Sequence, residues 1–177
     1  GLVPLAAICR DAGVDTFCVT EVSDAKQLRG AGFTQQILMI RPTCDVDEVH
    51  QLLDLDVVLT VSSQDDAAVL NGIATQRKQK VKAHIEIDTG MGRYGFSWDK
   101  LGAEIATFAE TVEITGTYSH FNNAEKMAHL QLNRFKQALE TLKKIGVNPG
   151  MTHMSNSAAF MTLGDGGLDA VRIGSAF

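Results

Sequence analysis

Residues Val81 to Phe96 read V-K-A-H-I-E-I-D-T-G-M-G-R-Y-G-F, and this stretch decides how the chain folds. Its first half alternates with a period of two, which places His84, Glu86 and Asp88 on one face of a strand and isoleucines on the other. Helices cover the outside of a parallel barrel, so we expect the isoleucine face to point outward and the polar face to line the interior. The alternative is a solvated edge strand followed by a glycine turn.

Short apolar runs alternate with helical patterns on both sides of this stretch. The expected strands are 16–20, 37–40, 57–60, 81–88, 113–121, 151–154 and 170–173. The expected helices are 2–12, 24–31, one that begins at Asp45, 64–77, 98–110, 126–145 and 157–162. Strict alternation predicts a parallel sheet, either doubly wound or closed into a (β/α)8 barrel. Because the chain opens on a helix, we expect an α/β TIM-type barrel that lacks its first strand in this chain.

The helix ends carry their own signals. Asp45 and Ser63 are expected N-caps, since each is followed three residues later by an acidic residue in the capping-box position. Ser97 is the expected N-cap of the helix 98–110. Gly146 is expected to end the longest helix, because glycine accepts the left-handed conformation that follows a helix.

Composition limits the class of protein. The chain has 177 residues and a formal charge of −5, which fits one domain and argues against binding to a phosphate backbone. It contains 45% hydrophobic residues but no apolar run of the ~18 residues that a spanning helix needs. The three cysteines form no C-x-x-C pair, which argues against a disulfide framework or a metal site and favours the cytoplasm. The missing initiator Met and the strand-like run before Phe177 indicate a segment cut at both ends.

Polar and basic residues follow several expected strands, where a barrel gathers its reactive groups. His120 closes one strand, Asn156 and Ser157 open the helix after another, and Arg172 and Gly174 close the last. Backbone N–H groups that open a helix bind anions, although Ser and Asn are also ordinary N-caps. A strand histidine is often only packed, and the arginine has a strand carboxylate as an alternative partner. Together these residues predict a site for a phosphorylated cofactor or substrate.

Four motifs resemble one family. The runs D-T-G-M-G-R-Y-G-F (88–96), Y-S-H-F-N-N-A-E (118–125), H-M-S-N-S-A-A (153–159) and V-R-I-G (171–174) resemble, in order, the motifs of pyridoxal-phosphate-dependent alanine racemases. The resemblance implies that residues 1–177 are a cofactor-carrying barrel domain, followed by a separate β-domain. It also implies a homodimer whose active site lies at the subunit interface.

The resemblance assigns three catalytic roles. Arg93 resembles the arginine beside the phenolic oxygen of pyridoxal phosphate and the substrate carboxylate, so it is also the substrate-binding residue. His120 resembles the histidine packed against the pyridine ring. Arg172 resembles the arginine that donates to the pyridine nitrogen. Because arginine stays protonated and only donates, it would leave that nitrogen unprotonated, which suits racemisation.

The resemblance also assigns the cofactor's phosphate. Asn156 and Ser157, with Gly174 and Ser175 through their backbone N–H groups, resemble the phosphate cradle. One departure concerns Glu86, which stands where many alanine racemases carry a carbamylated lysine. We expect Glu86 to supply the same negative charge and to support Arg93 through a Glu86–Arg93 interaction.

Two further departures, in the pair 122–123 and in the tail 171–177, leave serine, lysine or ornithine open as the amino acid that is racemised. The family's Schiff-base lysine and opposing tyrosine base lie outside this segment, so we expect the segment to be inactive alone. The expected partner is a small amino acid, without nucleic acid or membrane contact. The alternatives are a non-catalytic pyridoxal-phosphate carrier, a phosphosugar-binding barrel enzyme and a decarboxylase of the same fold.

Overall fold

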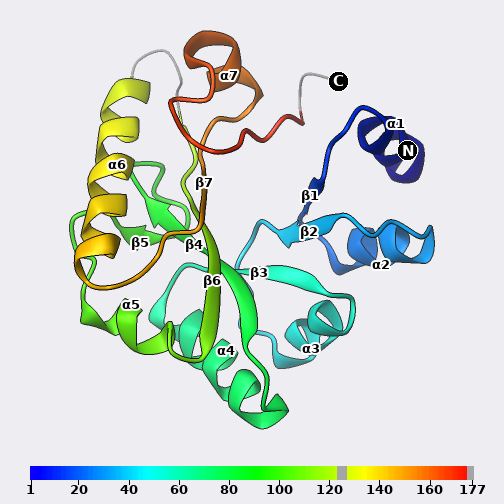
Figure 1. The fold of residues 1–177 in the computed structure, drawn as a ribbon, viewed down its shortest axis with the longest axis horizontal. Coiled ribbons are helices and arrows are strands. Elements are labelled where there is room, and N and C mark those ends of the chain that lie inside the picture. The colour runs from blue at the N-terminus through cyan, green and yellow to red at the C-terminus, as the bar shows by residue number, and fades with distance from the viewer. Residues whose placement is uncertain (123–126, 175–177) are drawn as a thin grey trace.

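A computed structural model describes residues 1–122 and 127–174, and in this part of the chain strands and helices alternate around a curled sheet (Figure 1). The helices are α1 (Leu2–Asp11), α2 (Val22–Gly30), α3 (Val46–Asp54), α4 (Gln64–Arg77), α5 (Ala103–Phe108), α6 (Ala128–Lys144) and α7 (Ser157–Leu163). The strands are β1 (Thr16–Val19), β2 (Gln36–Met39), β3 (Val57–Val61), β4 (Val81–Asp88), β5 (Phe96–Ser97), β6 (Val112–Tyr118) and β7 (Met151–His153).

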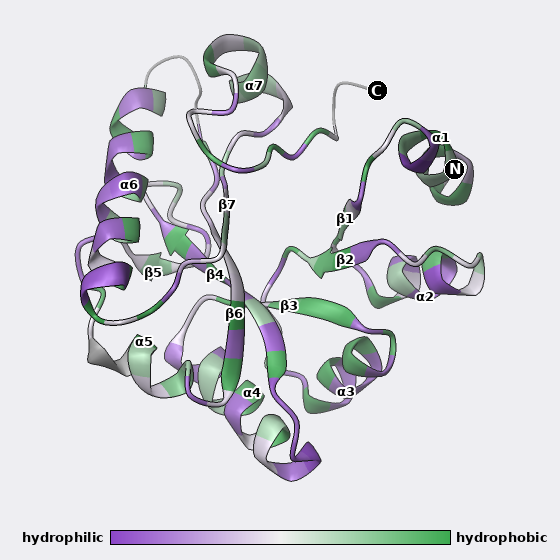
Figure 2. Ribbon diagram, viewed as in Figure 1, coloured by the Kyte–Doolittle hydropathy of each residue, from purple (hydrophilic) through white to green (hydrophobic). Residues whose placement is uncertain are grey.

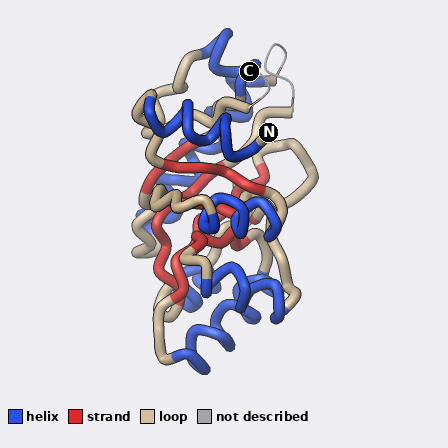
Figure 3. The backbone as a smooth tube through the Cα atoms, turned by 90° about the vertical axis from the view of Figure 1, so that its right-hand side faces the viewer, coloured by secondary structure: helices blue, strands red, loops and turns tan. Residues whose placement is uncertain are grey.

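The order of the strands distinguishes the two predicted architectures. The sheet runs β1-β2-β3-β4-β6-β7, every described pair is parallel, and β5 adds to β4 outside this path. A doubly wound sheet reverses its order at a switch point, and this sheet does not. The helices α2 to α6 form an arc around the strands, which stays open between α1 and α7 (Figure 1), and the side view also places helices outside the strands (Figure 3). The fold is therefore a curled half-barrel.

Strand β4 has the two faces that its alternation predicts. Ile85 and Ile87 are fully buried in the main hydrophobic cluster, which also contains the apolar faces of the helices. His84 and Glu86 are buried as well, on the opposite face of the strand. Figure 2 shows β3 as hydrophobic over its length, whereas α6 alternates between hydrophobic and hydrophilic residues. Burial of both sheet faces is typical of a parallel sheet with helices outside.

Most helix ends follow the predicted signals. The carboxylate of Asp45 accepts from the N–H of Glu48 at 3.0 Å, and Ser63 Oγ accepts from the N–H of Asp66 at 3.1 Å. Gly146 has φ 84° directly after α6, which confirms its role as a helix stop. Within the described residues, no helix combines the length and the apolar character needed to cross a membrane.

Two predicted elements are wrong. The helix expected over 98–110 is only α5, because Ser97 belongs to β5 and pairs with Asp88, and Gly102 is the residue before the helix. The strand expected over 170–173 is reduced to one bridge between Ala170 and His153. The segment stays beside residues 153–155 without forming a regular ladder, and the Arg172 N–H donates to Ser155 O at 2.9 Å. Strand β5 was not predicted.

Candidate active site

Arg172 is the centre of the polar cluster at the carboxyl ends of the strands. Its Nη1 lies 2.5 Å from His153 Nδ1, and its Nη2 donates to Ser119 O at 2.8 Å and lies 3.2 Å from His120 Nδ1. Burial lowers the pKa of the guanidinium, which nevertheless remains a cation because its ordinary value is so high. No described residue accepts a hydrogen bond from Nε of Arg172. The cluster therefore holds a fixed positive charge, and its Nε–H is among the donors that no described residue accepts.

The donors of Arg172 fix the tautomers of two buried histidines. Since a guanidinium only donates, His153 accepts at Nδ1 and carries its proton on Nε2. That nitrogen lies 2.9 Å from Nδ1 of His84, so His84 accepts there and carries its own proton on Nε2. His84 Nε2 is buried and has no hydrogen-bond partner among the residues that the structure describes. Burial and the nearby Arg172 lower the pKa of both rings, to about 4 for His84, so both are neutral.

His120 lies at the mouth of this cluster. Burial, followed by the charges of Arg172 and Arg93, lowers its pKa to about 4. Its ring is therefore neutral at physiological pH, and its Nε2 lies 3.4 Å from Nδ2 of Asn156. A neutral, half-buried imidazole presents a flat surface against which an aromatic ring can pack.

The start of α7 brings together the residues expected to bind phosphate. The side chain of Asn156 accepts from the N–H of Ala159 at 2.9 Å, which makes it the N-cap of the helix. The N–H of Gly174 donates to Ser157 Oγ at 3.0 Å. This hydrogen bond joins the start of α7 to the segment that ends at Gly174, and Ser157 is the acceptor for the Gly174 N–H. Ser175, also expected to hold phosphate, lies outside the described residues.

Glu86 is buried on β4, only 3% exposed. Its Oε2 lies 3.1 Å from the hydroxyl of Tyr118, which is the neighbouring residue on β6. Burial raises the pKa of this carboxyl to about 7, against the lowering effects of the Tyr118 hydrogen bond and of the charges on Arg93 and Arg172. Near neutral pH the carboxyl is therefore divided between its acid and its ionised form.

The expected Glu86–Arg93 interaction is not a direct ion pair and otherwise stays a prediction. Among the described residues no ion pair within 4.0 Å joins the two side chains, although the charge of Arg93 lowers the pKa of Glu86. Arg93 is exposed, and its guanidinium carbon lies 5.5 Å from the centroid of the Tyr94 ring. The alternative pairing of Arg172 with a strand carboxylate is wrong, because Arg172 donates to imidazoles and carbonyls instead.

The roles of Asp88 and Gln131 in holding the glycine loop are not among the predictions from sequence. Oδ1 of Asp88 accepts from the N–H groups of Gly90, Met91 and Gly92, at 2.9, 2.9 and 3.1 Å, and so holds the loop that leads to Arg93. The only sequence signal for this role is an Asp placed just before a glycine-rich turn.

From α6, fully buried Gln131 joins that loop to the end of β6. Its Nε2 donates to Thr89 Oγ1 at 3.4 Å and to His120 O at 3.2 Å, and its Oε1 accepts from the N–H of Asn122 at 3.2 Å. The available signal was a glutamine on the apolar side of the longest helix, which requires buried polar partners.

This geometry agrees with comparisons against known proteins. The family described as "Alanine racemase, N-terminal domain" matches residues 1–177. The chain belongs to this family. An alanine racemase from Desulforamulus reducens is 35% identical over 98% of this chain and 49% of its own length. One from Methanococcus maripaludis is 32% identical over 98% of this chain and 48% of its own length. The chain thus spans about half the length of these curated relatives.

Solved alanine racemases share the fold. The Clostridium difficile 630 enzyme in complex with cycloserine has a TM-score of 0.90 and 30% identity, over 98% of this chain and 50% of that chain. The Bacillus anthracis enzyme with bound L-Ala-P has a TM-score of 0.84 and 31% identity, over 99% of this chain and 47% of that chain. The curled sheet is therefore the alanine racemase barrel without its first strand, as predicted.

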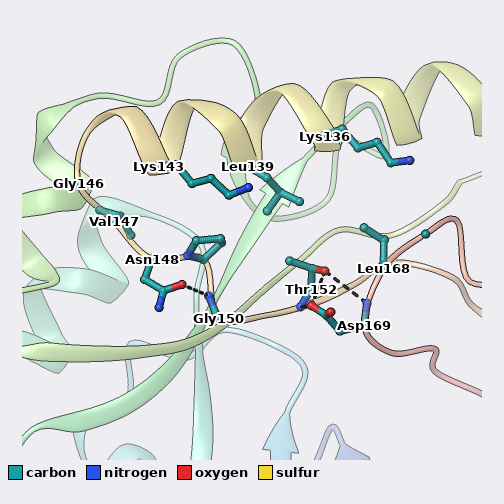
Figure 4. Close-up of a pocket in the computed structure, with 12 residues that line it drawn as sticks. Lys136, Leu139, Lys143, Gly146, Val147, Asn148, Gly150, Thr152, Leu168 and Asp169 are labelled. Atoms are coloured by element: carbon teal, nitrogen blue, oxygen red, sulfur yellow. Dashed lines mark hydrogen bonds between the residues drawn. The ribbon is translucent and has the colours of Figure 1, made fainter.

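Two cavities are large enough for a small ligand in this alanine racemase domain. One, of about 560 Å³, is lined by Cys18, Leu38, His84, His153, Arg172 and Gly174, among others, and so reaches the candidate site. The other, of about 650 Å³, lies between α6 and the segment that leads into β7, with Lys136 and Lys143 on the helix side (Figure 4). None of the predicted site residues lines that second cavity. Of the predicted site residues, Arg172 and Gly174 line the first cavity, whose wall is otherwise formed largely by residues 2–19.

Proposed function

We propose that this chain is the cofactor-binding barrel domain of a pyridoxal-phosphate-dependent racemase that interconverts L- and D-alanine. The observation that carries the proposal is Arg172, a part-buried cation held by His153 and Ser119, with Nε left for an acceptor. A pyridine nitrogen is such an acceptor, and an arginine cannot pass it a proton. The residues present therefore fit the cofactor that the family resemblance implies.

The other residues of the site bind and orient. Ser157, Asn156, Gly174 and Ser175 would hold the phosphate, with the Gly174 N–H exchanging its bond to Ser157 for one to phosphate, and the neutral ring of His120 would pack against the cofactor ring. Arg93, presented by the loop that Asp88 holds, binds the carboxylate of the amino acid. Bound pyridoxal phosphate supplies the electron sink that acidifies the Cα–H bond of the substrate.

Residues elsewhere in the longer protein complete the site in this proposal. A lysine that binds the cofactor and a tyrosine on the opposite side would serve as the two bases, the tyrosine from a β-domain beyond residue 177. The protein acts as a homodimer in the cytoplasm, where the three free cysteines remain reduced. Its length supports this division, since the chain covers about half of each curated relative.

The test uses the full-length protein. We expect it to acquire visible absorption with pyridoxal phosphate and to convert L-alanine to D-alanine, measured with a D-amino-acid oxidase assay. Arg172→Glu in the same protein should retain its fold by circular dichroism and catalyse side reactions such as transamination. Racemisation of serine, lysine or ornithine in preference to alanine would correct the substrate. Cofactor binding without any racemisation would indicate a carrier, and absence of cofactor binding would overturn the proposal.

A further inference from the structure

Tyr118 occupies the middle of the polar interior but has no role so far. It is the last residue of β6 and is only 1% exposed. In the sheet it pairs with Glu86 on β4 and with His153 on β7. It therefore lies between the carboxyl that faces Arg93 and the imidazole that holds Arg172.

The ring of Tyr118 contacts the Arg172 side of the site. It stacks on His153 with ring centroids 5.0 Å apart and an interplanar angle of 11°. The guanidinium carbon of Arg172 lies 5.1 Å from the centroid of the Tyr118 ring. A buried cation gains more from an aromatic face than an exposed one, because no water competes for it. The ring is thus a support for both Arg172 and the histidine that accepts from it.

The hydroxyl of Tyr118 anchors that ring to the other side of the half-barrel. It lies 3.0 Å from Thr60 Oγ1, donates to Ile40 O at 3.3 Å and lies 3.1 Å from Glu86 Oε2. Thr60 in turn donates to Met39 O at 2.8 Å, so its oxygen offers a lone pair to the phenol. Burial raises the pKa of the phenol, which therefore stays neutral and has one proton to donate to one of these acceptors at a time.

We propose that Tyr118 is a positioning residue of the cofactor site: its ring sets the place of Arg172, and its hydroxyl makes a smaller contribution by anchoring the ring. The inference rests on the proposed function, because Arg172 is the residue that would meet the pyridine nitrogen. Tyr118 itself touches neither cofactor nor substrate in this assignment. Its hydroxyl contacts the ends of β2, β3 and β4, and its ring contacts Arg172, so Tyr118 links the place of the arginine to these three strands.

Two substitutions separate the ring from the hydroxyl. Tyr118→Phe keeps the aromatic face and removes the anchor, and Tyr118→Leu removes both. Phe135→Leu is the matched control, since Phe135 is fully buried in α6, on a different element from Tyr118 and Arg172. All three variants are made in the full-length protein, and each apoprotein is titrated with pyridoxal phosphate while its thermal unfolding is measured.

We expect Tyr118→Leu to weaken cofactor binding by about tenfold and to shift the absorption maximum of the bound cofactor, because Arg172 loses its support. Tyr118→Phe should change the Kd by less than about threefold and leave the absorption maximum in place. Phe135→Leu should lower the Tm by about as much as Tyr118→Leu does, without changing the Kd or the spectrum. If Tyr118→Leu behaves like Phe135→Leu in Kd and spectrum, the proposal is overturned.

A crystal structure of the ligand-free variants keeps this test independent of the proposed function. If the wild-type protein binds no pyridoxal phosphate, the proposed function fails, but the place of Arg172 can still be observed. We expect its guanidinium to remain on His153 and Ser119 in Tyr118→Phe and to leave them in Tyr118→Leu. An unmoved guanidinium in Tyr118→Leu would overturn the proposal. If that variant does not fold, Tyr118→Met, which is longer and more flexible than leucine and also lacks an aromatic face, replaces it.

Discussion

Replacing Glu86 by glutamine is expected to change how stability depends on pH. The buried carboxyl has its pKa raised from 4.5 to about 7, because ionisation in the interior is unfavourable. The folded protein therefore binds this proton more tightly than the unfolded chain does. Its stabilising effect is complete below about pH 4.5 and is lost as the pH rises through about 7. At about 1.4 kcal/mol per pH unit, the loss approaches about 3 kcal/mol.

Urea unfolding of wild type and Glu86→Gln across this pH range measures the effect. We expect the difference in free energy of unfolding between them to grow by about 3 kcal/mol in favour of the variant between acid and mildly alkaline pH. Taking the difference cancels the histidines, whose lowered pKa values act in the opposite direction. Glu113→Gln, at an exposed position on β6, is the control and should give a difference that does not change with pH. A constant difference for Glu86→Gln would refute the reasoning.

Three other substitutions test other parts of the structure. Arg172→Lys replaces a fork by a point charge and leaves buried acceptors unpaired, so urea unfolding should show a loss of about 2–3 kcal/mol. Gly116→Ala places a Cβ 2.5 Å from the ring of His84, and we expect about 1–3 kcal/mol of destabilisation in the same assay. The hydrogen bond to Asp66 raises the pKa of the Cys44 thiol to about 11, so Cys44 should react slowly with iodoacetamide at mildly alkaline pH. Asp66→Asn should accelerate that reaction by up to about 100-fold, and an unchanged rate would contradict the assignment.

The fold was largely predictable because its signals are local. Alternation along 81–88 and the capping residues Asp45 and Ser63 depend only on neighbouring residues, and all appear in the structure as expected. The failures depend on distant partners. Ser97 pairs with Asp88 instead of opening a helix, and residues 170–173 make only one bridge with β7. Neither event can be read from the residues within a few positions of it.

The sequence was enough to predict that the site residues lie at strand ends, but not which hydrogen bonds and ring contacts they make with one another. The sequence places Arg172 and His120 at the ends of expected strands, and the structure brings them within 3.2 Å of each other. It could not show that His153 and Tyr118 would meet the same guanidinium, because these residues come from strands whose register is set by the whole sheet. The burial that raises the pKa of Glu86 is likewise a property of the packed interior.

Arg172, His153 and His84 form a hydrogen-bonded chain, in which the protonation of each ring depends on the bond to its neighbour. Arg172 donates to His153, and His153 donates to His84, whose remaining N–H ends the chain. One extra proton anywhere along it would set two donors face to face, so a single ring cannot be charged without breaking a bond to its neighbour. Acid would therefore displace the arginine as the rings are protonated. Protonation of His84, whose pKa is lowered to about 4, would break its hydrogen bond from His153, the ring that accepts from Arg172.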